Sequence, residues 1–311
     1  MILCDLHCDT ATALYHLRWK LADNARCAVS LDKASVYDKY IQCAAIFTSS
    51  RRTDEEGWEQ FFRVRRYFLD ECEKNNCTLC SDGTMLKDFL ASPTDRNAFI
   101  LTVEDARILG GKSERLEILY DAGVRLITPV WGGDSCIGGA HNTDNGLTEF
   151  GKSTVEEALA RGMIVDISHA SLPTADTILS LARKYPGKVC ASHSNAYAVT
   201  PHRRNLTDKQ MRLLAQSDGI VGINLYVLFL STSEKATAED VVRHIEYCTN
   251  ICGEDHVAFG CDLDGAETPT ELPNVASLIT LIPHLHRKGY SDDRIEKLFY
   301  GNACRFLTDA L

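Results

Sequence analysis

The sequence contains no run of about 18 or more apolar residues, the length that a membrane-spanning helix requires. Its first residues also lack the basic segment followed by an apolar segment that is typical of a secretory leader. Acidic residues outnumber basic ones, and the formal net charge of -10 opposes nonspecific attraction to nucleic acid or to an anionic membrane. We therefore expect a cytoplasmic protein that acts on a small molecule and binds neither nucleic acid nor membrane.

No proline- or serine-rich linker, charge block or internal repeat divides the 311 residues. The 13 cysteines are odd in number and irregularly spaced, which favours reduced thiols over a disulfide framework. These features predict a single catalytic domain over residues 1–311 in a reducing compartment.

Short β-rich segments alternate with amphipathic helical segments along the whole chain. The predicted strands are residues 3–9, 40–48, 98–104, 124–131, 164–169, 189–193, 220–226 and 257–262. The predicted helices include residues 55–73, 154–161, 174–184, 208–216, 238–251 and 275–288, with capping boxes at Ser153-x-x-Glu156 and Thr207-x-x-Gln210. Eight strands with intervening helices predict an α/β fold, a (β/α)8 TIM-like barrel.

Potential metal ligands gather where these strands end. They are His7 and Asp9, Glu104, His169, His193, and the pair Asp262 and Asp264. The carboxyl ends of barrel strands form the catalytic face, so these side chains are expected to meet there. Imidazole and carboxylate donors suit a two-metal site with Glu104 bridging, and Zn2+ is the expected occupant.

At this point the sequence resembles a known family, the membrane dipeptidase or renal dipeptidase family of zinc metallopeptidases. The matching stretches are DLHCD at 5–9, TVE at 102–104, GVR at 123–125, NGLTEFG at 145–151, GMIVDISH at 162–169, SHS at 192–194, RRN at 203–205 and GCDLDG at 260–265. They extend over nearly the whole chain in order. Lipid anchoring gives the family its name, but we expect no anchor here, because neither a leader nor a hydrophobic tail is visible.

The resemblance implies a barrel of the metal-dependent hydrolase type. It also implies a dipeptidase with two Zn2+ ions per chain and a metal-activated bridging water. His7 and Asp9 would bind one metal, His169 and His193 the other, and Glu104 both. Asp262 matches the family's acid/base residue, and Arg204 matches the arginine that receives the free carboxylate of the dipeptide. The resemblance also suggests a homodimer. Nitrogen and oxygen ligands admit Mn2+, Fe2+ or Co2+ as well as Zn2+.

Two positions depart from the family pattern. Trp131 stands where well-studied animal members have a histidine that stabilises the oxyanion. Its indole N–H can donate a hydrogen bond but carries no charge, so Trp131 is either a donor to substrate or an apolar pocket wall. Asp105 replaces a glycine beside Glu104 and adds a carboxylate that could repel acidic substrates.

The remaining candidates lie outside the strand ends. His16, His244, His284 and His286 fall in helical segments and are interpreted as surface or packing residues. His141 and His202 fall in loops from which either could contact substrate. The glycine-rich residues 132–146 follow the fourth strand and are expected to shape the pocket. Cys8 and Cys261 are interpreted as core residues.

Two other functions remain open from the sequence. An amidohydrolase acting on a cyclic amide or lactone uses similar chemistry, but its first strand typically resembles His-x-His with a carboxylated lysine, whereas this chain has His7 and Asp9 with Glu104. A barrel that binds metal or peptide without turnover is the other alternative, and the presence of Asp262 and Arg204 argues against it.

Overall fold

Strand pairing closes most of the sheet into a ring in the computed structural model, which describes residues 1–233 and 235–311. The strands are β1 (Ile2–Cys8), β2 (Lys39–Phe47), β3 (Thr78–Leu79), β4 (Asn97–Glu104), β5 (Val124–Thr128), β6 (Ile164–Asp166), β7 (Val189–Ala191), β8 (Ile220–Ile223) and β9 (Val257–Phe259). Neighbours pair in parallel in the order β2-β1-β9-β8-β7-β6-β5-β4, and β2 also pairs with β4. This pairing confirms the predicted (β/α)8 barrel.

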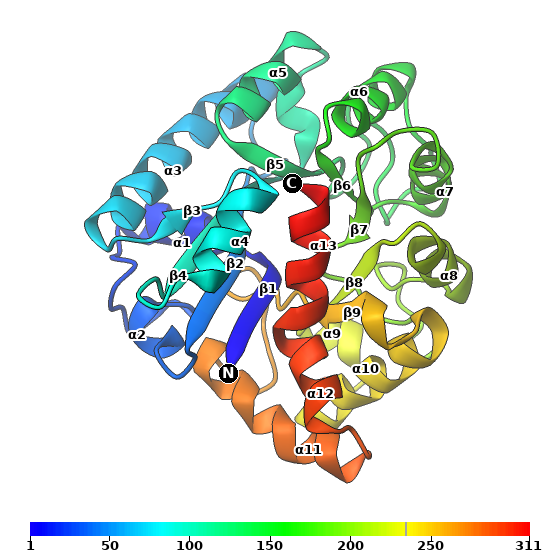
Figure 1. Ribbon diagram of the computed structural model, residues 1–311. Helices are drawn as coiled ribbons and strands as arrows, with labels where there is room; N and C mark the ends of the chain where they lie inside the picture. Colours follow the sequence, from blue (N-terminus) through cyan, green and yellow to red (C-terminus); the bar gives the residue numbers. More distant parts are fainter. Residues whose placement is uncertain (234) are drawn as a thin grey trace.

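The helices surround this barrel (Figure 1). They are α1 (Thr10–Leu17), α2 (Leu31–Ala34), α3 (Asp54–Lys74), α4 (Gly83–Ala91), α5 (Glu114–Asp121), α6 (Glu149–Ala160), α7 (Leu172–Leu181), α8 (Asp208–Gln216), α9 (Val227–Leu230), α10 (Ala238–Cys252), α11 (Ile282–Arg287), α12 (Asp292–Glu296) and α13 (Asn302–Ala310). Shorter helical turns are η1 (Ala106–Leu109), η2 (Glu254–His256), η3 (Val275–Leu281) and η4 (Lys297–Gly301). None of the helices in the described ranges combines the length and hydrophobicity of a membrane span.

The amino end of the barrel is closed by apolar side chains. Phe306 and Leu307 of α13 and Phe89 of α4 pack with inward residues of the strands, such as Ile100, in one buried cluster. Figure 1 shows α13 lying across this end of the barrel. Since the amino end is filled, open space near the barrel axis is left at the carboxyl ends of the strands.

Several strands are shorter than their sequence patterns predict. β6, β7 and β9 end at Asp166, Ala191 and Phe259, so His169, His193 and Asp262 lie in the loops that follow them. The two-residue strand β3 was not predicted; it pairs only with β4 among the described strands. These three candidates therefore lie in loops that short strands hold in place, whereas His7 and Glu104 lie within β1 and β4.

The two predicted capping boxes have different outcomes. Thr207 and Gln210 bond each other reciprocally at the start of α8, as predicted. The box at Ser153 is wrong, because α6 begins at Glu149, five residues before the predicted start at Thr154. There the Thr148 hydroxyl accepts a hydrogen bond from the Gly151 amide at 2.9 Å and caps the helix.

Candidate active site

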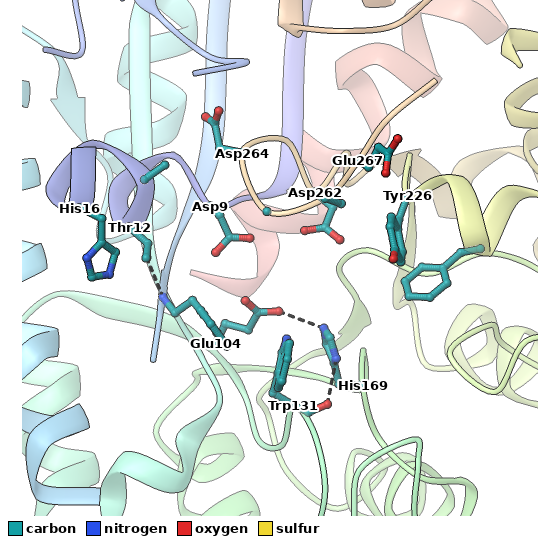
Figure 2. A pocket seen from close by; sticks show the side chains of 15 residues that line it. Asp9, Thr12, His16, Glu104, Trp131, His169, Tyr226, Asp262, Asp264 and Glu267 are labelled. Carbon is teal, nitrogen blue, oxygen red and sulfur yellow. Dashed lines mark hydrogen bonds and ion pairs between the residues drawn. The ribbon is translucent and has the colours of Figure 1, made fainter. Parts of the chain in front are cut away.

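A cavity of about 580 Å³ opens at the carboxyl ends of the strands. Figure 2 shows the predicted residues that line it: Asp9, Glu104, Trp131, His169 and Asp262. The other predicted residues, His7, His193 and Arg204, are at most 3% exposed and lie beneath this surface. The structure thus brings all eight predicted site residues to one end of the barrel.

A bulge in β1 directs His7 into the barrel. The pairing with β2 matches Asp5 to Gln42 and Cys8 to Ala44, so β1 has one extra residue between these pairs. Leu6 packs in the inner cluster, yet the next residue, His7, also reaches inner groups such as Glu104. Side chains therefore do not simply alternate between the two faces along this strand.

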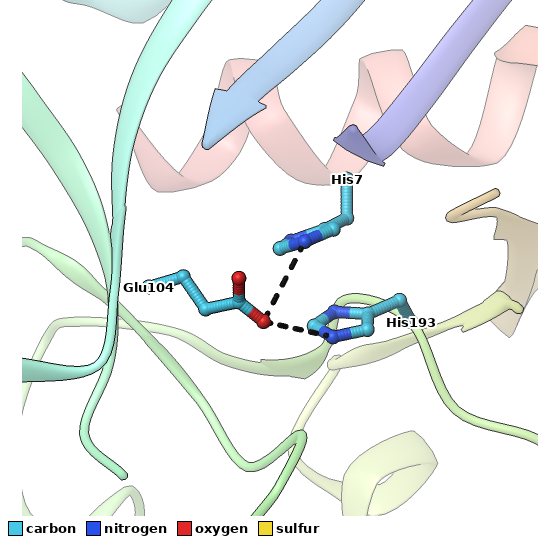
Figure 3. A group of neighbouring side chains, drawn as sticks. All are labelled: His7, Glu104 and His193. Carbon is cyan, nitrogen blue, oxygen red and sulfur yellow. Dashed lines mark ion pairs between the residues drawn. The ribbon is translucent and has the colours of Figure 1, made fainter. Parts of the chain in front are cut away.

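The carboxylate of Glu104 lies at the centre of three imidazoles. Its Oε1 atom is 3.0 Å from Nε2 of His169, 3.4 Å from Nε2 of His193 and 3.7 Å from Nε2 of His7. Figure 3 shows two of these contacts, with the rings of His7 and His193 stacked at 3.6 Å between centroids. Asp9 Oδ2 lies 3.6 Å from His7 Nε2 on the other side.

The outer nitrogens of two histidines fix which ring nitrogen carries a proton. His169 Nδ1 lies 3.1 Å from the Trp131 carbonyl oxygen, which can only accept a hydrogen bond. His193 Nδ1 lies 2.6 Å from the Ser192 hydroxyl, which donates its own proton to Asp166 Oδ2 and therefore accepts from Nδ1. With their protons on Nδ1, both rings direct an Nε2 lone pair inward, and these two Nε2 atoms are only 3.0 Å apart. Two facing lone pairs at this distance repel each other unless a cation lies beside them.

The charges of the cluster also favour a bound cation. Burial, followed by the nearby Arg204, lowers the pKa of His169 well below its usual range, and burial with His7 does the same to the pKa of His193. Burial alone would lower the pKa of His7, but the carboxylates of Glu104, Asp9 and Asp262 outweigh it and raise that pKa to about 10. Burial and the Asp9 carboxylate raise the pKa of Glu104. The negative charge of the carboxylates in this cluster thus exceeds the positive charge that the neighbouring side chains supply.

These donors fit a metal centre. Ligand atoms of His7, Glu104 and His193 lie within 4.8 Å of one another, as do those of His7, Asp9 and Asp262. Both nitrogens of His7 and Oδ1 of Asp9 are buried with no hydrogen-bond partner among the described residues. Buried polar atoms are rarely left without a partner, so these atoms mark positions where a cation would complete the site.

Strained backbone holds several of these side chains. His169, Asp262 and Asp264 all have positive φ values, of 67°, 59° and 69°. Such left-handed conformations are uncommon for residues other than glycine and concentrate at functional sites. The His169 carbonyl accepts the His141 amide at 2.6 Å, which ties the turn after β6 to the glycine-rich loop.

Asp262 faces the cluster from the loop after β9. Its Oδ1 atom is 3.9 Å from His7 Nε2, while Oδ2 accepts a hydrogen bond from the Asn224 amide at 3.0 Å. Burial raises the pKa of Asp262 to about 6, against the opposing effects of His7 and Asn224. A carboxylate of this kind can accept and return a proton near neutral pH.

Arg204 is a buried cation with unused donors. Its Nη1 atom donates to the Ser194 hydroxyl at 2.9 Å, and its guanidinium lies 5.5 Å from the centre of the Phe229 ring. Nε and Nη2 have no hydrogen-bond partner in the described part of the chain. Burial lowers the pKa of Arg204 to about 10, so it stays charged at neutral pH. Its free edge suits a carboxylate.

The two departures from the family pattern have clear positions. The Trp131 ring packs against Phe47 at 5.0 Å between centroids and forms part of the cavity wall, which favours the apolar-wall interpretation. Asp105 is fully buried and paired with Arg107 at 2.5 Å. It does not line the cavity, so the expectation that it repels acidic substrates is wrong.

Sequence reasoning missed several lining residues. His16, assigned to the surface or to packing, lines the cavity, as do Tyr226 and Phe229 from the segment after β8. Asp264, which the sequence did mark as a potential ligand, also lines the cavity and accepts hydrogen bonds from the Thr10 hydroxyl and from the backbone of the loop before α2. No local motif marks the aromatic pair, because only the barrel closure brings it to the site.

The loop histidines and cysteines are placed as follows. His141 lies with its ring 5.8 Å from that of His169. It also lines, with other residues of the glycine-rich loop, a neighbouring cavity of about 520 Å³. His202 packs 4.8 Å from Phe229. Cys8 and Cys261 are fully buried in the core, as predicted.

Comparison with known proteins identifies relatives along the whole chain. Residues 1–310 match the model of the membrane dipeptidase family, peptidase family M19. A Klebsiella pneumoniae protein described as an uncharacterized protein in the pqqA 5′ region is 36% identical over 222 residues, covering 68% of this chain and 81% of that protein. Dipeptidase aclJ of Aspergillus oryzae is 34% identical over 232 residues; the match covers 71% of this chain and 53% of that longer protein.

Solved structures agree with the fold. The dipeptidase AC, a metallopeptidase of family M19, superposes with a TM-score of 0.89 at 26% identity, covering 100% of this chain and 98% of its own. A metallopeptidase from Rhodobacter sphaeroides, liganded with a phosphinate mimic of the dipeptide L-Ala-D-Ala, superposes with a TM-score of 0.88 at 24% identity, covering 100% and 99%. The chain therefore belongs to the membrane dipeptidase family, peptidase family M19, and is a metallopeptidase.

Proposed function

We propose that this enzyme hydrolyses dipeptides to two amino acids at a centre of two Zn2+ ions. His7 and Asp9 would hold one ion, His169 and His193 the other, and Glu104 would bridge them. The observation that carries this proposal is the pair of inward Nε2 atoms of His169 and His193, 3.0 Å apart beside Glu104 Oε1. Their outer hydrogen bonds leave both atoms as bare electron-pair donors, the form in which imidazole binds metal.

Two bound cations would lower the pKa of a water molecule and polarise the scissile carbonyl. The protein supplies the proton transfers. Asp262 Oδ1 faces the ligand cluster and would take the proton from the attacking water, then deliver it to the leaving amine. Asn224 holds the other oxygen of Asp262 and so keeps Oδ1 directed inward.

Arg204 would select for the length of the substrate. Its unpaired Nε and Nη2 offer the planar edge that binds a carboxylate through two hydrogen bonds. A carboxylate held there belongs to the residue that follows the cleaved bond, which restricts hydrolysis to dipeptides. The dipeptide mimic bound by the Rhodobacter sphaeroides relative supports a substrate of this size.

Metal analysis and a substrate screen test the proposal together. We expect about two Zn2+ per chain after zinc-supplemented expression. We also expect hydrolysis of members of a dipeptide library that carries L or D residues at the C-terminal position. The same dipeptides with an amidated C-terminus are the matched control and should be poor substrates.

The outcomes separate the alternatives. Absence of metal would overturn the two-metal centre. Bound metal without hydrolysis of any dipeptide would refute the dipeptidase assignment and favour a cyclic amide or lactone as substrate. Cytoplasmic location and a homodimeric state stay predictions, which cell fractionation and light scattering would check.

A further inference from the structure

Ser192 lies between a buried carboxylate and one of the proposed metal ligands. Its hydroxyl is 2.6 Å from Asp166 Oδ2 and 2.6 Å from His193 Nδ1. All three side chains are fully buried. The Asp166 carboxylate also accepts the amides of Ser168 and Ser192 and the Thr128 hydroxyl.

The number of hydrogens fixes the direction of these bonds. A serine hydroxyl has one proton, and both oxygens of the Asp166 carboxylate accept hydrogen bonds from the groups around them, so the hydroxyl proton points to Asp166. Its oxygen must then accept from His193 Nδ1–H. This arrangement leaves Nε2 of His193 without a proton and directs it at Glu104 Oε1, 3.4 Å away.

The backbone around Ser192 is held as firmly as its side chain. The Ser192 amide donates to Asp166 Oδ1 at 2.8 Å. Its carbonyl oxygen lies against Gly222 and Gly260, where an added Cβ would come within 1.9 and 1.7 Å of it. Ser192 therefore has little freedom to turn away from His193.

We propose that Ser192 is a positioning residue that, together with Asp166, fixes the tautomer and orientation of His193. It does so by accepting the Nδ1 proton, so that Nε2 is ready to bind a cation. The other histidines differ: His169 uses the backbone carbonyl of Trp131 for this purpose, and neither nitrogen of His7 has a hydrogen-bond partner among the described residues. The inference rests on the proposed metal centre, but its first test does not require metal.

Ser192→Ala and Thr128→Val form a matched pair. Each removes one hydroxyl bonded to the same oxygen, Asp166 Oδ2, at 2.6 and 2.7 Å, but only Ser192 also contacts His193. Long-range nitrogen–proton NMR of metal-free protein, with resonances assigned through His193→Gln, reports the tautomer. We expect a single Nδ1–H tautomer in wild type and Thr128→Val, and a mixture in Ser192→Ala.

Competition with a chromophoric chelator gives the second readout. Ser192→Ala should bind one of its two Zn2+ ions about 10- to 100-fold more weakly, while Thr128→Val changes little. An unchanged tautomer and zinc affinity in Ser192→Ala, or equal effects of both variants, would overturn the proposal. If Ser192→Ala does not fold, Ser192→Cys, similar in size but a weaker acceptor, decides by the same measurements. A wild-type protein that binds no zinc would instead refute the metal centre. The tautomer measurement would still test whether Ser192 fixes the tautomer of His193.

Discussion

Gly265 lies against the proposed metal centre. Adding a single methyl group at this position therefore tests the geometry of the centre. It follows Asp264 in the loop after β9 and lies against the carboxylates of Asp9 and Asp262. A Cβ added at Gly265 would lie 2.0 Å from Asp9 Oδ2 and 2.8 Å from Asp262 Oδ1. We predict that Gly265→Ala displaces Asp9 from its position as a ligand.

The size of the effect follows from these distances. To regain an ordinary contact of about 3.4 Å, the Asp9 oxygen must move by about 1.4 Å. Metal–ligand distances tolerate only about 0.2 Å, so Asp9 cannot keep both its ligand position and an acceptable contact. Oδ1 of Asp9 has no hydrogen-bond partner among the described residues, so little resists the movement. We expect about one bound metal in place of two, and a kcat/KM for dipeptides at least about 100-fold lower.

Metal analysis, dipeptide kinetics and thermal unfolding of Gly265→Ala check this reasoning. Gly132→Ala is the matched control, because a Cβ there meets no described atom within 4 Å although Gly132 follows the cavity residue Trp131. The control should keep both metals and nearly full activity. Gly265→Ala with two tightly bound metals and a wild-type rate would show that Asp9 is not a ligand in this geometry.

Three further changes test other groups. Asp262→Asn should keep its metal and lose about 100- to 10,000-fold in kcat, measured at saturating dipeptide; a nearly unchanged kcat would remove Asp262 from proton transfer. Arg204→Leu should lower kcat/KM for free dipeptides about 100-fold and leave the slow hydrolysis of amidated dipeptides unchanged; an equal loss on both would mean that Arg204 does not bind the carboxylate. Burial lowers the pKa of His244 from 6.5 to about 4, so the unfolded chain binds this proton more readily and folding weakens as pH falls from about 6.5 toward 4, by up to about 3 kcal/mol. The free energy of unfolding in urea should depend less on pH, between pH 7 and pH 5, for His244→Gln than for wild type. An equal pH dependence in both proteins would show that His244 does not cause this loss of stability.

The barrel and the candidate ligands at its carboxyl end could be predicted because both follow from local patterns. Alternating strands and helices fix the topology, and the topology brings the carboxyl ends of the strands together. His169 and His193 could thus be expected at the same face although they follow different strands, whereas their assignment to one metal came from the family resemblance. The pairing of β2 with β4, which closes the ring, follows from the same topology.

The less predictable features depend on exceptions to those patterns. The β1 bulge cannot be read from the segment around His7, because alternation and a bulge both leave His7 and Asp9 on one face. Asp105 could be misassigned because proximity in sequence to Glu104 says nothing about its side chain, which turns away to Arg107. The start of α6 at Glu149 could not be predicted, because Thr148 and Ser153 are both acceptable N-terminal caps.

The two halves of the proposed centre are held by different means. On one side, outer hydrogen bonds fix His169 and His193, so these rings are oriented before any metal binds. On the other side, the His7 ring and Oδ1 of Asp9 have no hydrogen-bond partner among the described residues. Shape positions these side chains: a bulge directs the histidine inward, and Gly265 leaves room for the carboxylate. Side-chain atoms that are held by shape have no hydrogen bond of their own to restore them after a displacement. Small steric changes near Asp9 should therefore impair the centre more selectively than changes of equal size near His193, where several bonds oppose movement.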